Sequence, residues 1–226
     1  PGELGRDTVD DIFISLGAGR LADADSVVVV NDGTNGEPAV VRATGGDVPW
    51  TFIQGAVESE DPILEDQGLE IVTDYELAAD SWSVKVTTTF TNAGLTESRF
   101  NVTDGFMAAD EVLDGWASDA GIGQSVEEFL AVGAVGTGAE ASLSVWRTEG
   151  TLRSLGIAQL ASSAGLNFVS HGWETLAIGD SRVVERFWTA APDPLTAEGE
   201  RWRARGVALA AVSGTVSGPD GGVAGA

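Results

Sequence analysis

Cysteine is absent from this sequence of 226 residues, and histidine, methionine and tyrosine occur only once each. Without cysteine, the chain has no disulfide, no thiolate zinc site and no cysteine nucleophile. The fold must therefore be held by its core, and a chain of this length can bury a sizeable one without covalent staples. Seven tryptophans and eight phenylalanines supply large apolar side chains for that core.

Positive charge is also scarce. Twelve Lys and Arg residues stand against 35 Asp and Glu, which gives a net charge of −23, and Lys85 is the only lysine. Such a field repels nucleic acid and anionic membranes, so we set both aside as partners. No apolar run approaches the roughly 20 residues that span a bilayer, and the start at Pro1 lacks the basic and apolar stretches of a signal peptide. An acidic, lysine-poor surface favours a salty or extracellular setting.

Two runs in which apolar and polar residues alternate dominate the segment 67–92. Such a period of two residues is typical of a strand with one buried face. The short connection at 78–81 predicts that the two strands are antiparallel neighbours in a β-hairpin. The residues expected on its buried face are Tyr75, Leu77, Trp82, Val84, Val86 and Phe90.

Shorter strand signals surround this hairpin. The apolar run 27–30 stops at a strong turn signal, Asn31-Asp32-Gly33, and 38–43 is its expected partner. Further strands are expected at 50–57, 99–103, 143–147, 166–171, 183–189 and 206–216. Helical turns are expected at 108–113 within an ordered loop over 104–123, at 125–130 and at 197–203, with 152–161 either a short helix or a loop. Many short strands with Gly, Asp and Pro turns predict an all-β fold, an antiparallel β-sandwich with few short helices.

The hairpin and the segment after it resemble a known family. Asp74-Tyr75-Glu76-Leu77, a second strand that ends in Asn92-Ala93-Gly94, and Phe100-Asn101-Val102-Thr103-Asp104-Gly105 resemble the paired strands of galactose-mutarotase-like supersandwich domains. Similar regions open large bacterial surface proteins that continue into a PHP-type metallohydrolase, where a segment like Gly19-Arg20-Leu21-Ala22-Asp23-Ala24 precedes the hairpin. Mutarotase-like isomerases use two histidines and a glutamate, and a PHP-type site needs several histidines. With one histidine, the resemblance implies the fold and not the activity.

The stretch from Val212 to Ala226 resembles the first strand and turn of a carboxypeptidase regulatory-like module of the immunoglobulin type. A complete module of that kind needs about 100 residues. We therefore expect a β-sandwich domain over 1–212, and over 213–226 a linker or the first strand of a truncated module. Downstream domains of the same polypeptide are the expected partners of such a piece.

Residues that could carry catalysis are few. His171 and Glu174 could act as acid and base, but a histidine at a strand end beside a glycine turn is the more ordinary interpretation. Glu174 and Glu185 could form the carboxylate pair of a carbohydrate-active enzyme, although no acidic pair stands out among so many. We expect no enzymatic activity.

One acidic, glycine-containing segment could hold a metal ion. Asp104, Asp110 and Asp114 offer the hard oxygen ligands that Ca²⁺ prefers, so a structural Ca²⁺ is the one cofactor considered. Their spacing does not match the EF-hand loop, and a plain solvated loop is the competing interpretation.

Trp116 and Trp173 lie among glycines and are the aromatic candidates for an exposed sugar-binding platform. Packing beneath a loop is the alternative for both. With His171 and Glu174 they make up the expected ligand-binding residues. The sequence thus predicts a non-catalytic accessory domain of a large extracellular or cell-surface bacterial protein, with a glycan as its expected ligand. The competing function is a structural or self-assembling surface component that pairs through edge strands such as 27–30 and 206–216.

Overall fold

The computed structural model describes residues 9–17, 20–49, 68–109, 114–115, 125–126, 128–135, 139–161, 164–208, 217–218 and 221–222. Within these ranges the chain is antiparallel β-structure with one α-helix, as the alternating sequence predicts. The principal strands are β1 (Val9–Gly17), β2 (Arg20–Asp32), β3 (Ala39–Pro49), β4 (Leu69–Leu77), β5 (Ser83–Asn92), β6 (Ser98–Ala109), β9 (Glu128–Val135), β10 (Ala139–Trp146), β11 (Leu152–Ala161), β12 (Ala164–Leu176) and β13 (Ser181–Ala191). Two-residue strands are β7 (Asp114–Gly115), β8 (Ser125–Val126), β14 (Ser217–Gly218) and β15 (Gly221–Gly222).

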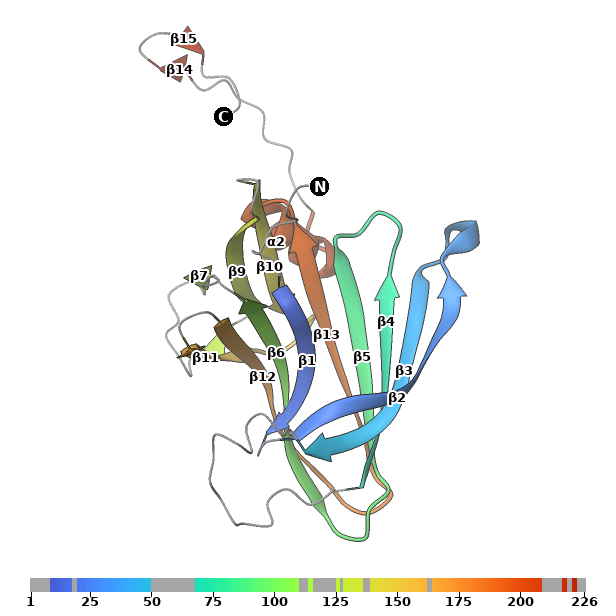
Figure 1. Cartoon of the computed structure of the whole chain (residues 1–226). Coiled ribbons are helices and arrows are strands. Elements are labelled where there is room, and N and C mark those ends of the chain that lie inside the picture. Colours follow the sequence, from blue (N-terminus) through green and yellow to red (C-terminus); the bar gives the residue numbers. More distant parts are fainter. Residues whose placement is uncertain are drawn as a thin grey trace, which may run out of the picture.

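Thirteen of these strands form one continuous sheet in the order β7-β9-β10-β13-β5-β4-β3-β2-β1-β6-β12-β11-β8. The sheet turns a corner between β1 and β2, which share only the register pairs Ser15↔Leu21 and Gly17↔Arg20. Figure 1 shows the result: β1, β6 and β12 lie across from β13, β5 and β4, so one sheet supplies both layers of a sandwich. Side chains that alternate inward on both layers meet between them.

The central hairpin is confirmed as β4 and β5, with Ile71 opposite Phe90 and Thr73 opposite Thr88. Val86 and Phe90 are fully buried, as their inward positions predict. The prediction is wrong at the connecting end of the hairpin, where Leu77 is 42% exposed and Trp82 is 53% exposed. Leu77 is the last residue of β4 and Trp82 precedes β5. Alternation tells which face a residue occupies, but not how far the covering layer extends.

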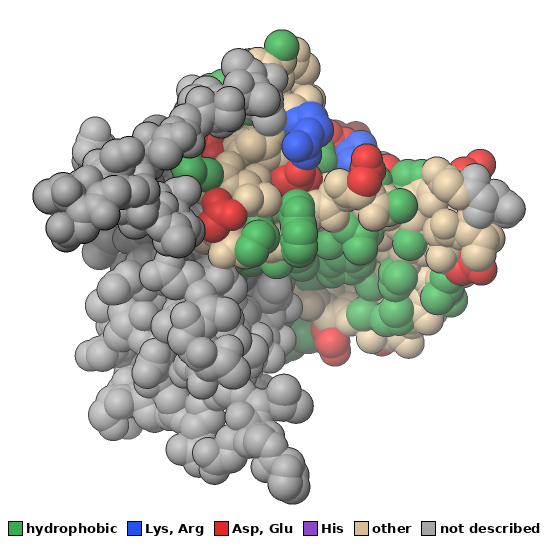
Figure 2. Space-filling view, turned by 90° about the horizontal axis from the view of Figure 1, so that it is seen from above, with side chains coloured by type: hydrophobic (Ala, Val, Ile, Leu, Met, Phe, Trp, Pro, Cys, Tyr) green, Lys and Arg blue, Asp and Glu red, His purple; other side chains and the backbone are tan. Residues whose placement is uncertain are grey.

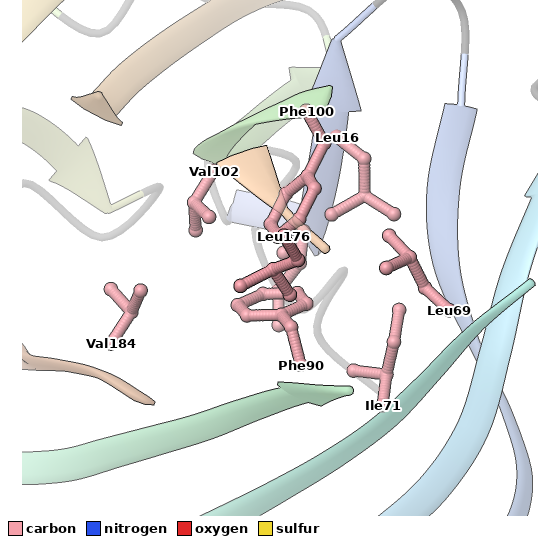
Figure 3. Close-up of a cluster of buried hydrophobic side chains, with 9 residues drawn as sticks. Leu16, Leu69, Ile71, Phe90, Phe100, Val102, Leu176 and Val184 are labelled. Atoms are coloured by element: carbon pink, nitrogen blue, oxygen red, sulfur yellow. The ribbon is translucent and has the colours of Figure 1, made fainter. Parts of the chain in front are cut away.

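The main core fills the space between the layers near the first residues of β4 and β6 (Figure 3). Phe90 on β5 and Phe100 on β6 come from opposite layers, and their ring centroids are 5.0 Å apart. Burying one such side chain stabilises the fold by about 1.5–3 kcal/mol. The buried members of the cluster are Ile14, Leu16, Leu69, Ile71, Phe90, Phe100, Val102, Leu176 and Val184.

Several segments expected to be loops or helices are strands instead. Residues 104–109 continue β6, the residues around 125–130 belong to β8 and β9, and 152–161 form β11. A capping-type pattern favoured a helix at 125–130, yet residues 128–135 pair along their whole length with β10. Sheet pairing decides the conformation of such short apolar runs, because local propensity is weak beside tertiary contacts. The strand expected at 50–57 and residues 110–113 lie outside the described residues.

The one α-helix of the described part, α2 (Pro194–Ala204), confirms the helical turn expected at 197–203. Asp193 caps it by accepting from the backbone N of Thr196 at 2.9 Å, and proline stands at the first turn. This helix is too short to cross a membrane, and no other helix of the described residues could do so. Toward the C-terminus, β14 and β15 pair only with each other in the described residues, while 209–216 lie outside them.

Candidate functional site

An open groove lies where α2 approaches the outer face of the sheet, beside the loop that joins β4 to β5. Its volume is about 480 Å³, and its lining combines three aromatic rings with charged and hydroxyl side chains. Pockets for small ligands typically measure 300–1,000 Å³ and combine apolar walls with a few polar groups. The side chains that matter below are Asp80, Trp82, Trp146, Phe187, Glu200 and Arg203.

The groove keeps its shape because Glu200 ties α2 to the hairpin loop. One carboxylate oxygen, Oε2, accepts from Ser81 Oγ at 2.8 Å and from the backbone N of Trp82 at 3.1 Å. The other, Oε1, is paired with Arg203 one helical turn further along. The backbone O of Trp82 in turn accepts from the backbone N of Ala190 on β13 at 3.0 Å. The loop that carries Trp82 is thereby fixed on both sides.

Aromatic rings form the base and the rim of the groove. Trp146 on β10 and Phe187 on β13 are opposite each other in the register, and their rings stack at 4.0 Å with an interplanar angle of 2°. Trp146 is fully buried and donates its Nε1–H to Thr189 Oγ1 at 2.9 Å. Trp82 is more than half exposed and lines the same space. The arrangement suits a ligand that offers a flat apolar face together with hydroxyl groups.

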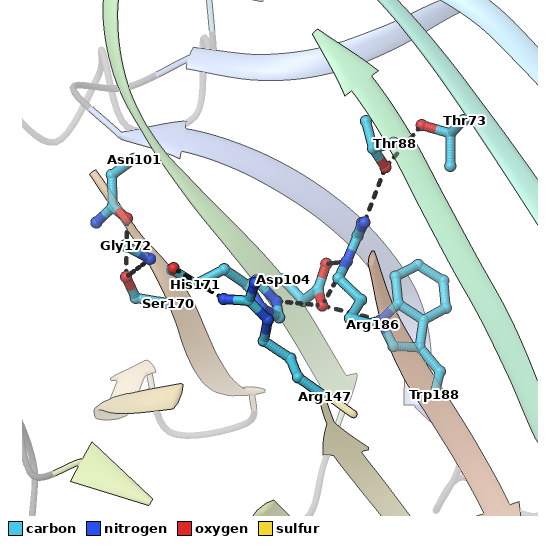
Figure 4. Close-up of polar contacts among 10 residues, drawn as sticks. All are labelled: Thr73, Thr88, Asn101, Asp104, Arg147, Ser170, His171, Gly172, Arg186 and Trp188. Carbon is cyan, nitrogen blue, oxygen red and sulfur yellow. Dashed lines mark hydrogen bonds and ion pairs between the residues drawn. The ribbon is translucent and has the colours of Figure 1, made fainter. Parts of the chain in front are cut away.

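A second group of polar side chains is buried between the two layers (Figure 4). Asp104 on β6 accepts from Arg186 Nε at 2.9 and 3.0 Å, from Trp188 Nε1 at 2.9 Å, and contacts His171 Nε2 at 2.8 Å. Arg186 also donates to Thr88 Oγ1 at 2.8 Å. The side chains of Asp104 and Arg186 have no exposed surface. The ion pair therefore joins one layer of the sandwich to the other.

The protonation states in this cluster follow from burial and pairing. Burial alone would raise the pKa of Asp104, but Arg186 and His171 outweigh it and hold the pKa at about 2. Burial lowers the pKa of His171, and the neighbouring Asp104 offsets this only in part. At neutral pH the cluster therefore holds a carboxylate, a guanidinium and a neutral imidazole. The His171 side chain is only 1% exposed, so it cannot reach a bound ligand, and its position is that of a structural residue.

The residues proposed from the sequence as partners in catalysis have other partners in the structure. His171 bonds to Asp104 rather than to Glu174, which forms an ion pair with Arg182 at 3.2 Å. Glu185 pairs with Lys85 at 2.8 Å. Each of the two glutamates thus has its own basic partner.

Only one of the three predicted calcium ligands has a described side chain. Asp104 is buried and engaged by Arg186, His171 and Trp188, whereas Asp110 and the side chain of Asp114 lie outside the described residues. Among the described residues there is no group of three or more His, Asp or Glu side chains that could hold a metal ion. The calcium site therefore stays a prediction about the segment that follows Ala109.

Of the two tryptophans proposed as a sugar platform, only one lies among the described residues. Trp116 lies outside the described residues. Trp173 on β12 is 58% exposed, and the guanidinium of Arg99 lies 4.9 Å from its ring centroid. Trp82 was expected to be buried, and it is this residue that lines the groove. Its position directly after the loop residues Asp80 and Ser81 was the available signal, because exposed functional side chains gather on loops.

Comparisons with known proteins give likeness of shape. No family model matches the chain, and no curated protein matches it. A TPR-domain containing protein from Parabacteroides distasonis matches with a TM-score of 0.48 and 11% identity, over 81% of this chain and 38% of its own. The GH36 alpha-galactosidase from Geobacillus stearothermophilus matches with a TM-score of 0.42 and 12% identity, over 80% of this chain and 30% of its own. A galactose mutarotase related enzyme from Lactobacillus acidophilus matches with a TM-score of 0.37 and 6% identity, over 73% of this chain and 71% of its own. The chain spans about a third of the first two, and none of these likenesses carries a residue role to it.

Proposed function

We propose that this chain is a carbohydrate-binding β-sandwich domain, a non-catalytic accessory part of a larger extracellular or surface bacterial protein. The observation that carries the proposal is Trp82, an exposed indole on a backbone that is hydrogen-bonded on both sides, at a groove whose lining includes Phe187 stacked on the buried Trp146. The C–H face of a pyranose ring is apolar and flat, so it packs on an indole face while its hydroxyls remain at the edge.

Polar side chains around the groove suit those hydroxyls. The Arg203 side chain is 64% exposed, so its guanidinium has donors beyond the one that Glu200 occupies. Asp80 is exposed and offers an acceptor in the hairpin loop. Glu200 acts as a positioning residue, because both of its oxygens hold other groups in place. The net charge of −23 favours a neutral glycan over a strongly anionic one.

A glycan array probed with the wild-type chain, Trp82→Ala and Trp173→Ala tests this proposal. The two variants each remove one indole that is more than half exposed, and only Trp82 lines the groove. We expect binding with a Kd of about 10 µM to 1 mM, typical of a shallow site. Trp82→Ala should abolish the signal and Trp173→Ala should keep it. No signal with the wild type, or loss only with Trp173→Ala, would refute the groove as the site.

A further inference from the structure

The outward edge of β2 has no strand beside it over most of its length in the described part of the chain. On one side, β3 pairs with β2 from Arg20 to Asp32. On the other side, β1 pairs with it only at Arg20 and Leu21. From Ala22 to Asn31, the backbone N–H and C=O groups on that outer side therefore have no strand partner among the described residues. An open edge of this kind is a template for one more strand.

Four consecutive valines occupy this edge, and all of them are exposed. Val27, Val28, Val29 and Val30 are 65%, 49%, 67% and 53% exposed. Since successive residues of a strand point to opposite faces, β2 is apolar on both faces here. Figure 2 shows hydrophobic side chains gathered along the part of the molecule that ends at the β2–β3 hairpin. Long apolar edges are normally shielded by charge, proline or a covering segment.

A small cavity opens beside the start of the same edge. It measures about 210 Å³, and Ala22, Asp23 and Ala24 of β2 line it together with Ile71 and Tyr75 of β4. A strand added alongside β2 points alternate side chains toward this face. The cavity would accept one apolar side chain of that strand, and Asp23 would lie close to it.

The charges around the valines decide which kind of strand fits. Asp23, Asp25 and Asp32 are all exposed and flank the run. If two copies paired β2 with β2 antiparallel along their valines, the end with Asp23 and Asp25 would lie against the Asp32 end of the other copy. Like charges directly opposite on paired strands are destabilising, and the net charge of −23 adds long-range repulsion between copies.

We propose that the β2 edge binds an extended segment of another polypeptide as an added strand. The segment is apolar and β-branched at its centre and carries Lys or Arg at its ends. Main-chain hydrogen bonds would supply affinity, the valines and the cavity would select the central side chains, and the three aspartates would select the basic ends. This inference is independent of the groove at α2, because none of these residues lines that groove.

A random twelve-residue peptide library displayed on phage tests the proposal directly. The wild-type chain, Val28→Lys and Val183→Lys serve as baits. Val183 on β13 is 55% exposed, so its variant adds the same charge at an exposed valine away from the β2 edge. We expect the wild type and Val183→Lys to enrich peptides with a β-branched centre and basic ends. A synthetic peptide of the enriched type should bind Val28→Lys at least about tenfold more weakly, and its Glu-ended counterpart should bind the wild type weakly as well.

Three results would overturn the proposal. One is enrichment of the same peptides on Val28→Lys, and another is the absence of any enrichment on the wild type. The third is a concentration-dependent dimer of the wild type in sedimentation that Val28→Lys abolishes, because the occupant of the edge would then be a second copy. Circular dichroism of both lysine variants checks that each retains the fold.

Discussion

At the scale of single residues, Asp104 joins the two layers by engaging Arg186 and Trp188 on β13 and His171 on β12. A buried ion pair is weak evidence for net stability, because desolvation of both charges offsets their attraction. Removing only one partner of the pair is strongly destabilising. A lone charge left in the core has neither water nor partner, and that asymmetry makes the cluster testable.

Asp104→Asn should lower the free energy of unfolding by about 3–5 kcal/mol, because Arg186 would keep a buried and uncompensated charge. The double variant Asp104→Leu/Arg186→Met should be much less destabilised, since no lone charge remains. Urea denaturation measures both. Lys85→Met is the surface control, because the exposed pair of Lys85 with Glu185 is worth less than about 1 kcal/mol. Equal losses in Asp104→Asn and Lys85→Met would contradict the buried pairing.

His171 should make the fold sensitive to mild acid. Above its ordinary pKa of 6.5 the imidazole is neutral in both states, whereas below it the unfolded chain gains a proton that the folded chain, with its lowered pKa, does not. The free energy of unfolding should therefore fall as the pH drops below 6.5. His171→Gln removes this proton site and should flatten the stability profile between pH 7 and 5. The same slope in both proteins would show that His171 is not buried in its neutral form.

Asp104 contributes in a separate pH window. Its pKa is lowered from 3.8 to about 2, so the stability it provides is present above pH 3.8 and is lost as the pH falls toward 2. The half-buried Asp74 and Asp193 also have lowered pKa values, owing to hydrogen bonds from Arg42 and Thr196, and act in the same acid range. This steep loss below pH 4 should persist in His171→Gln.

Sequence reasoning at this scale reached some of these residues but not their relations. Asp104 and His171 were singled out, yet as a calcium ligand and as a partner of Glu174. Arg186 lies two residues from both Val184 and Trp188 along β13, so it shares their face and places a charge on the inward side. A charged residue among apolar residues on an inward face indicates a buried ion pair. The identity of its partner was not readable, because Asp104 is 82 residues away in the chain.

At the scale of elements, the hairpin of β4 and β5 was the best predicted part of the molecule. Long alternating runs fix register and face together, because a slip of one residue would expose every inward side chain. Short runs such as 125–130 carry too few residues to show a period, and pairing with β11 and β10 decides them. The α2 groove was missed because it arises from elements that are distant in the sequence: the hairpin loop, two strand faces and a helix.

Val86→Asp tests the assigned register of the hairpin. Val86 is fully buried opposite Tyr75, so a carboxylate there should cost at least about 3 kcal/mol in unfolding free energy. Leu77→Asp places the same charge on the same face at the exposed end and should cost less than about 1 kcal/mol. Thermal melts of the two variants should therefore separate clearly. A Val86→Asp protein that melts like the wild type would show the register to be wrong.

At the scale of the whole molecule, one folded sheet provides both layers, and among the described strands none pairs with the outer edge of β2 beyond Leu21. The boundary expected after residue 212 concerns this scale as well. Of the tail, the structure describes only β14 and β15, which pair with each other and with no other described strand.

Deletion of 213–226 should leave the midpoint of urea unfolding nearly unchanged, because the tail adds no strand to the described main sheet. Truncation after Gly206 should be more harmful, since the apolar run that follows was expected to close the sandwich. This truncation also removes the hydrogen bond that the backbone N–H of Val207 donates to the carbonyl of Trp202 in α2 at 2.9 Å. A large loss of stability from the shorter deletion would place the tail within this domain.

The central claim is that the groove at α2 binds a carbohydrate through Trp82. The most direct measurement is a heteronuclear NMR titration of the indole N–H resonances with a saccharide selected on the array. We predict that the indole N–H resonance of Trp82 shifts progressively to saturation, while that of Trp173, which is also more than half exposed, stays in place. A shift confined to Trp173, or no shift of either at millimolar saccharide, would contradict the account.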